Sequence, residues 1–191
     1  MTVARRLGAY LDHDNARVAT ANRLALLIAA NQPFYPVFLY LALGKPLPVA
    51  AWTLLSTPGF LAVPALSHRF PTLARVLLVF SGIGNTLLCL ALYGEDSGVA
   101  LFLLPCVMIA ALSFTNKEGT VRLALVALGL AAFVGTHGRI PGRTVFVAPD
   151  AYNALWSVHA YSVAMLTALI GLQFSNLEQR SDRSKETQNS P

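Results

Sequence analysis

Charged residues are scarce in this chain: Asp, Glu, Lys and Arg make up 12% of the 191 residues, while 55% are apolar. A soluble domain usually carries about a quarter charged residues, and so large an apolar fraction leaves too little polar surface to cover a water-soluble core. The scarcity excludes an ordinary soluble domain and indicates a membrane protein. The formal net charge is +5, but the basic residues lie between apolar runs rather than in a patch, so nucleic acid is not a predicted partner.

Recognised catalytic and ligand-binding motifs are also missing. The sequence has no Walker loop, zinc-ligand spacing or nucleophile–base pair, so no enzyme activity, cofactor or metal site is predicted. The two cysteines, Cys89 and Cys106, fall inside apolar runs, where buried thiols usually behave as small hydrophobes; free thiols are expected. No cleavable signal peptide is visible, because the first long apolar run exceeds a signal-peptide core. We interpret that run as a retained signal anchor.

The chain does have long apolar runs. A membrane-spanning helix needs about 20 predominantly apolar residues, and only the fourth of the runs here is marginally short. The sequence therefore predicts an all-α, six-helix transmembrane bundle over residues 19–174, after a cytoplasmic segment, 1–18. The tail, 175–191, is expected to be mobile beyond its first turn or two. The six predicted spans are 19–43, 49–66, 73–92, 98–114, 121–138 and 155–174.

The basic residues predict the orientation of these spans. With six spans, three of the 14 Lys and Arg residues, namely Lys45, Arg139 and Arg143, fall on one side, and the rest share the side of both termini. Lys and Arg are enriched in cytoplasmic loops. Both termini are therefore expected in the cytoplasm, and the acidic pair Glu95 and Asp96 on the outside.

Polar residues inside the apolar runs are candidates for function, because polar groups are costly in a bilayer. Asn31, Gln32 and Tyr35 stand in the first run beside Pro33 and Pro36, and prolines remove backbone donors and bend a helix. We interpret this segment first as a structural kink whose amides bind neighbouring helices. The alternative is a broken helix that lines a polar cavity.

Later runs contribute further polar and small residues. Asn85 lies among small residues in the third run, where a hydrogen bond across a helix contact is the expected role. His159 lies inside the sixth span, whereas His137 stands at the outer edge of the fifth. Without a second ligand at similar depth, we interpret His159 as a hydrogen-bonded structural residue rather than a haem or metal ligand. Small residues at four-residue spacing suit helix packing within the chain or between copies: Ala127, Ala131 and Gly135, and Ala160, Ala164 and Ala168.

These polar residues lie at similar depths in the membrane when their positions are counted along the predicted spans. At about 1.5 Å per residue, they fall between mid-membrane and the outer surface, with Trp52 and the acidic pair just above. We therefore predict an outward-opening pocket for a small or lipophilic ligand. Its candidate residues are Asn31, Gln32, Tyr35, Trp52, Asn85, Glu95, Asp96, His159 and Tyr161.

The stretch Gly94–Pro105, GEDSGVALFLLP, is similar to the third-to-fourth helix junction of six-helix membrane domains in bacterial signalling proteins. Those domains precede class III adenylate or guanylate cyclases, and related ones precede histidine kinases and diguanylate cyclases. The order of elements resembles theirs as well, with a charged segment, residues 176–186, leaving the last span like a signalling helix. The resemblance implies a sensor or anchor module in a bacterial inner membrane. The 191 residues contain no output domain, so cyclase or kinase activity is not carried over.

Three function classes follow from these observations. The first is a non-enzymatic sensor or anchor protein whose partners are the lipid bilayer, a second copy of the chain and a cytoplasmic signalling partner. The alternative is a small transporter or permease with broken helices around a midplane site, for which a charged residue deep within a span is missing. The third, a haem-binding protein or intramembrane enzyme, lacks its ligand or catalytic set.

Overall fold

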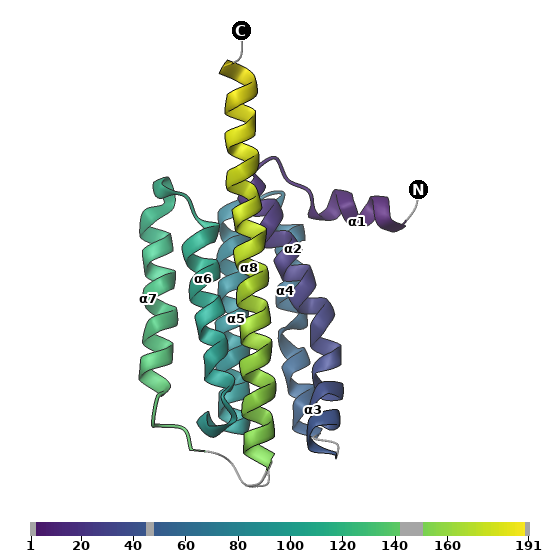
Figure 1. Cartoon of the computed structure of the whole chain (residues 1–191), viewed down its shortest axis with the longest axis vertical. Coiled ribbons are helices and arrows are strands. Elements are labelled where there is room, and N and C mark those ends of the chain that lie inside the picture. Colours follow the sequence, from purple (N-terminus) through teal and green to yellow (C-terminus); the bar gives the residue numbers. More distant parts are fainter. Residues whose placement is uncertain (1–2, 45–47, 142–150, 190–191) are drawn as a thin grey trace.

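The computed structural model describes residues 3–44, 48–141 and 151–189, and the side chains of residues 7–44, 48–141 and 151–177. All elements within these ranges are helices, which confirms the all-α prediction. They run mostly side by side in one bundle (Figure 1). In chain order they are α1 (Val3–Leu11), α2 (Ala16–Asn31), η1 (Gln32–Phe34), α3 (Tyr35–Leu43), η2 (Pro48–Ser56), α4 (Thr57–Ser67), α5 (Pro71–Tyr93), η3 (Glu95–Ser97), η4 (Val99–Phe102), α6 (Leu103–Ser113), η5 (Asn116–Glu118), α7 (Gly119–Thr136) and α8 (Tyr152–Asn189), where η marks a 3₁₀-helix.

The two ends of the bundle differ, and we name them by what lies there. At the tail end, α8 continues past its neighbours and α1 lies across the bundle axis (Figure 1). At the loop end, α3 finishes and α8 begins. The first long helix starts at the tail end because Asn15 caps it: the Asn15 side chain accepts hydrogen bonds from the backbone N–H groups of Arg17 and Val18, as N-cap residues do.

Five segments of the described chain are long and apolar enough to cross a membrane. The fourth predicted span differs, because its residues form η4 and α6, an apolar segment shorter than the others (Val99–Ser113). This segment lies inside the bundle, where α6 packs against α5, α7 and α8. Membrane association is thus supported, while six complete crossings remain a prediction. The five long segments are Ala16–Leu43, Pro48–Ser67, Pro71–Tyr93, Asn116–Thr136 and Tyr152–Leu177.

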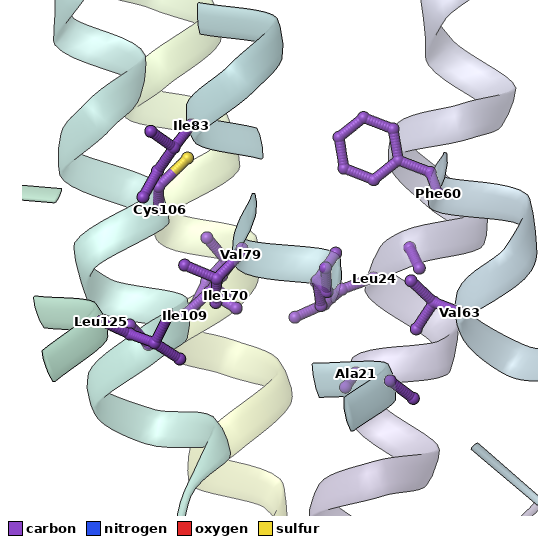
Figure 2. Packing of buried hydrophobic residues seen from close by; sticks show 14 of the residues in the cluster. Ala21, Leu24, Phe60, Val63, Val79, Ile83, Cys106, Ile109, Leu125 and Ile170 are labelled. Atoms are coloured by element: carbon purple, nitrogen blue, oxygen red, sulfur yellow. The ribbon is translucent and has the colours of Figure 1, made fainter. Parts of the chain in front are cut away.

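The main apolar core joins side chains from α2, α4, α5, α6, α7 and α8. Figure 2 shows Leu24 and Phe60, from α2 and α4, on one side of the view, and Ile109 and Ile170, from α6 and α8, on the other. In a bilayer the lipid tails are as apolar as these side chains, so the association of helices depends on close van der Waals packing. The core therefore holds the bundle together through its shape rather than through apolar burial alone.

Glycines allow the closest of these helix contacts. A Cβ atom added at Gly129 of α7 would lie 2.6 Å from Val107 Cγ2, and one added at Gly82 of α5 would lie 2.8 Å from Cys106 Sγ. Neither position has room for a side chain, so α6 approaches α7 and α5 at van der Waals distance. Cys89 and Cys106 are both free and buried, which confirms the prediction for the thiols.

Three features differ from the expectations or extend them. Residues 3–11 form a helix, α1, within the segment 1–18 for which the sequence analysis predicts no helix. The tail, whose mobility stays a prediction, continues α8 as a helix through Asn189, and no Gly or Pro interrupts residues 172–190. The small residues Ala127 and Ala131 of α7, and Ala164 and Ala168 of α8, are exposed, so these faces point away from the rest of the described chain.

Candidate functional site

The first long helix breaks where two prolines follow Asn31. Pro33 occupies an early position of the 3₁₀-helix η1, and Pro36 an early position of α3; neither can donate the hydrogen bond that would continue α2. The break buries the side chain of Gln32 and leaves Asn31 exposed. A polar side chain is thereby turned into the bundle, where it needs partners.

Gln32 finds its partners in a set of side chains that we call the amide cluster: Gln32, Ser56, Thr57 and Asn85. Gln32 Nε2 donates to Ser56 Oγ at 2.5 Å, and Gln32 Oε1 accepts from the Thr57 hydroxyl. The Ser56 hydroxyl oxygen also lies 2.9 Å from Asn85 Oδ1. Ser56 and Thr57 stand where η2 passes into α4, and Asn85 is on α5. The cluster therefore joins the first three long segments of the chain.

A groove opens beside the amide cluster, between η2–α4 and α5. Its volume is about 310 Å³, and none of its lining residues is charged. Gly59 keeps this region narrow, because a Cβ atom added there would lie 2.6 Å from Ser81 Oγ, whereas one added at Gly84 would meet no atom within 4 Å. The groove is lined by Leu55, Ser56, Gly59, Ser81, Gly84, Asn85 and Leu88.

A second set of polar and aromatic side chains lies at the loop end; we call Tyr35, Tyr93, Phe102 and His159 the histidine cluster. His159 of α8 is fully buried. Its Nδ1 lies 2.6 Å from the Ser97 carbonyl oxygen, and its Nε2 lies 2.7 Å from the Tyr35 hydroxyl. Because a carbonyl can only accept, Nδ1 carries the proton, and in the neutral ring Nε2 accepts from Tyr35.

The rings of the histidine cluster enclose this hydrogen-bonded chain. The His159 ring stacks on Tyr35 with centroids 5.8 Å apart, and Phe102 presents its edge at 5.9 Å. Tyr93 completes the set, with its centroid 6.3 Å from that of His159. The imidazole is therefore held by two hydrogen bonds and by rings from α3, α5 and η4. Such a group suits a structural link between helices, and its ring nitrogens are both occupied.

The acidic loop binds a neighbouring segment. The Glu95 carboxylate contacts His137 Nδ1 and accepts from the Gly138 N–H at 2.5 Å, while the Glu95 N–H donates to the Ile140 carbonyl at 2.9 Å. Glu95 thus holds the segment after α7 against η3. Among the residues that the structure describes, no group of three or more His, Cys, Asp or Glu side chains could hold a metal ion.

A family model, MASE7, matches residues 9–181. The chain belongs to the MASE7 family. It is a family of membrane-associated sensor domains, which supports the membrane-sensor part of the resemblance described above. No curated protein and no solved structure matches the chain. The matched residues of this MASE7 domain include both clusters and the groove.

The predicted site residues of the MASE7 domain separate into distinct environments. The structure brings Gln32 and Asn85 together through Ser56, and it brings Tyr35 and His159 into direct contact. It does not bring the rest to them: Glu95 binds the segment after α7, and the others are exposed on the surface. Those exposed residues are Asn31, Trp52 at 55%, Asp96, and Tyr161 at 72%.

Sequence reasoning missed the side chains that connect the predicted ones. Ser56 and Thr57 link Gln32 to Asn85, and the Ser97 carbonyl binds His159. Hydroxyl residues are common in membrane helices, so their presence alone is no signal. The adjacent Ser56, Thr57 and Pro58 inside an apolar run are the one local hint, since hydroxyl side chains can satisfy backbone groups that a proline frees.

The sequence analysis treats Arg75 as a charge that orients the chain, but the structure buries it. Its side chain is 3% exposed and forms an ion pair with Glu118 at the tail end, with Nη2 2.5 Å from Oε1 and Nη1 3.0 Å from Oε2. Arg75 Nη1 also donates to the Ser113 carbonyl at 2.6 Å, and the guanidinium lies 4.8 Å from the centroid of the Phe114 ring. The pair connects the start of α5 to the α6–α7 connection.

Proposed function

We propose that this MASE7 domain is a non-enzymatic membrane sensor that binds a small or lipophilic ligand in an outward-facing pocket beside the amide cluster and acts on partners through α8. The observation that carries the proposal is the continuity of α8 from Tyr152 to Asn189. One helix contains His159, inside the bundle, and also the segment that projects beyond the bundle (Figure 1). In this proposal six helices cross a bacterial inner membrane, and both termini are cytoplasmic.

The two clusters share one short segment, which supports communication between them. Gln32 of the amide cluster and Tyr35 of the histidine cluster stand three residues apart, on either side of Phe34 and Pro33. A change in the hydrogen bonds of Gln32 therefore displaces Tyr35 unless the break absorbs it. Tyr35 in turn contacts His159 on α8. A ligand beside the amide cluster is thus linked to α8 through the segment from Gln32 to Tyr35 and through the contact of Tyr35 with His159.

The geometry of α8 suits it to carry a displacement to the tail end. His159 and Asn189 are 30 residues apart, which corresponds to about 45 Å along a straight helix. No glycine or proline lies beyond Gly171 before Pro191, so nothing in the sequence provides a hinge in that part. A small rotation or shift at His159 would move the projecting segment as a rigid body. A cytoplasmic partner and a second copy of the chain are the proposed recipients of that movement.

The proposal is tested by cutting the contact between Tyr35 and His159 and measuring the tail end. Nitroxide labels at Lys117→Cys and Asn176→Cys, both exposed positions, report the distance between the α6–α7 connection and α8 in a background of Cys89→Ala and Cys106→Ala. Tyr35→Phe removes the hydroxyl that binds His159, and we expect a shifted or broadened distance distribution. Tyr40→Phe, on the same helix but half exposed, is the matched control. An unchanged distribution in folded Tyr35→Phe protein contradicts the proposal.

A transporter is the second candidate, and one observation favours it. Two discontinuous segments, α2–η1–α3 and η2–α4, contact each other at Gln32, Ser56 and Thr57. Broken helices that meet around polar groups form the substrate sites of many transporters. None of the four amide-cluster side chains is charged, so a neutral solute is the fitting substrate. Proteoliposomes that swell faster in glycerol or urea than empty vesicles, by stopped-flow light scattering, would favour transport over sensing.

A further inference from the structure

We infer that the groove between η2–α4 and α5 binds a neutral, membrane-dissolved molecule that presents a carbonyl oxygen to Ser81 and Asn85, and that this molecule enters sideways from the bilayer. The inference deepens the proposed function by naming the class of ligand. Only the effect of ligand binding on α8 rests on the proposed function. The occupancy of the groove can be measured separately.

The groove is open at the surface of the bundle. Leu55 on its rim is 64% exposed, and Gly84 is exposed on the opposite wall. A volume of about 310 Å³ is at the lower end of the range for pockets that hold drug-sized molecules, roughly 300–1,000 Å³. Both Gly84 and Leu55 belong to segments long and apolar enough to span the membrane. An occupant therefore reaches the groove from lipid rather than from water.

Two residues that line the groove, Ser81 and Asn85, carry hydrogen-bond donors with no acceptor among the described residues. Asn85 Oδ1 accepts from the Ser56 hydroxyl at 2.9 Å, whose single hydrogen is shared with the Thr53 carbonyl at 3.0 Å. This arrangement leaves the two N–H hydrogens of the Asn85 amide. Neither these nor the Ser81 hydroxyl makes a hydrogen bond to another described residue. Unsatisfied donors are costly in hydrocarbon, where water is absent. A ligand that offers an acceptor oxygen would satisfy them, and the absence of charged lining residues favours a neutral one.

The depth of these donors restricts the ligand further. Asn85 and Ser81 lie eight and twelve residues before Tyr93, the last residue of α5, which is about 12 and 18 Å along the helix axis. The hydrocarbon core of a bilayer is about 30 Å thick, so both donors lie well inside it. The ester carbonyls of phospholipids stay near the boundary of the core. The carbonyl must therefore belong to a molecule that dissolves in the hydrocarbon itself, such as an isoprenoid quinone or a long-chain ketone.

Trp52 provides the means of detecting the occupant. It lies three residues before Leu55 in the 3₁₀-helix η2, and residues three apart in a 3₁₀-helix project from the same face. The Trp52 ring therefore stands one turn from the rim of the groove. The chain has two tryptophans, so Trp156→Phe leaves Trp52 as the only fluorophore of this kind. A quinone bound in the groove would quench its emission.

The experiment titrates decylubiquinone into the Trp156→Phe protein in lipid nanodiscs and records the emission of Trp52. We expect saturable quenching. Gly84→Leu adds a side chain at a lining position of the groove where a Cβ atom would meet no atom within 4 Å, and it should weaken binding at least tenfold. Gly135→Leu is the matched control: its position is also open but lies on α7, and its binding should equal that of the parent. Asn85→Leu, which removes the donors while keeping an apolar wall, should weaken binding about tenfold.

Competition identifies the chemistry of the ligand. Displacement of decylubiquinone by 2-tridecanone shows that a carbonyl on an apolar chain suffices, and a lack of displacement narrows the ligand to the quinone ring. Displacement by dodecane at the same concentration overturns the role of the carbonyl. Quenching that rises linearly and equally in the parent and Gly84→Leu overturns the whole inference. If decylubiquinone binds but leaves the distances between labels at 117 and 176 unchanged, the ligand assignment stands and the sensor proposal fails. If decylubiquinone does not bind while Tyr35→Phe shifts those distances, the ligand assignment fails and the sensor proposal stands.

Discussion

The buried ion pair between Arg75 and Glu118 allows a quantitative prediction about stability. The Arg75 side chain is 3% exposed and that of Glu118 is 21% exposed. The carboxylate accepts two hydrogen bonds from the guanidinium, and it also binds Thr72 at 2.8 Å and Thr115 through both its N–H and hydroxyl at 3.1 Å. Glu118→Gln keeps the shape but replaces one acceptor oxygen by a donor. Part of this network must then break, and Arg75 loses its counter-charge.

The magnitude follows from burial. Removing one partner of a fully buried pair costs about 3–5 kcal/mol, because the other charge stays buried and unpaired. Glu118 is one-fifth exposed, so water screens part of its interaction with Arg75. We therefore expect Glu118→Gln to lower the free energy of unfolding by about 2–4 kcal/mol. Arg75→Gln should cost a similar amount. The double variant should cost clearly less than the sum, since no charge is then left unpaired.

The assay is reversible unfolding of the purified protein in mixed micelles with increasing SDS, followed by helical circular dichroism. A cycle of the parent, both single variants and the double variant yields the coupling energy between the two side chains. Arg122→Gln, at the same end with only a peripheral bond to Asn116, should change stability by less than about 0.5 kcal/mol. A coupling energy below about 0.5 kcal/mol would refute the reasoning, because the pair would then behave as an exposed one.

Two further predictions concern single positions. Gly98 has a φ of +75°, and a Cβ atom there would lie 2.7 Å from Trp156 Cδ1. Gly98→Ala should therefore destabilise the protein by about 1–3 kcal/mol and alter the emission of Trp156, which is measured in a Trp52→Phe background. A stability equal to that of the parent would contradict this prediction. Gln32→Leu removes two side-chain hydrogen bonds. Each hydrogen bond inside a membrane contributes about 0.6 kcal/mol, so the free energy of unfolding in the same SDS titration should fall by about 1 kcal/mol. A fall of more than about 3 kcal/mol would mean that Gln32 supports more than its own contacts.

The break in the first helix could be predicted from sequence, but its partners could not. Pro33 and Pro36 make an interruption necessary, since each lacks a backbone donor, and the structure has η1 there. Whether Gln32 or Asn31 faces inward depends on the exact geometry of that turn, which decides the direction of each side chain. The sequence analysis preferred a kink whose amides bind neighbouring helices. The contacts of Gln32 with Ser56 and Thr57 agree with it, whereas Asn31 is exposed.

Depth along the spans was a good guide to proximity, but depth alone does not determine which face a side chain occupies. Tyr35 and His159 fall at similar depth and do meet. Tyr161, only two residues from His159, is 72% exposed, because a helix turns by about 200° over two residues. Rotation about the helix axis is set by packing against neighbours, so the single pocket predicted from depth separates into an amide cluster and a histidine cluster.

The sequence by itself determined that this chain is a helical membrane protein and where its apolar helices lie, because the demand of the bilayer for internally satisfied backbone groups acts on each segment separately. The tertiary structure decided the features that depend on two segments at once: the burial of Arg75 against Glu118, the connection of Gln32 to Asn85 through Ser56, and the contact of His159 with Tyr35. These contacts depend on helix rotation and on close approach at glycines such as Gly82 and Gly129, and no single apolar run encodes either of them.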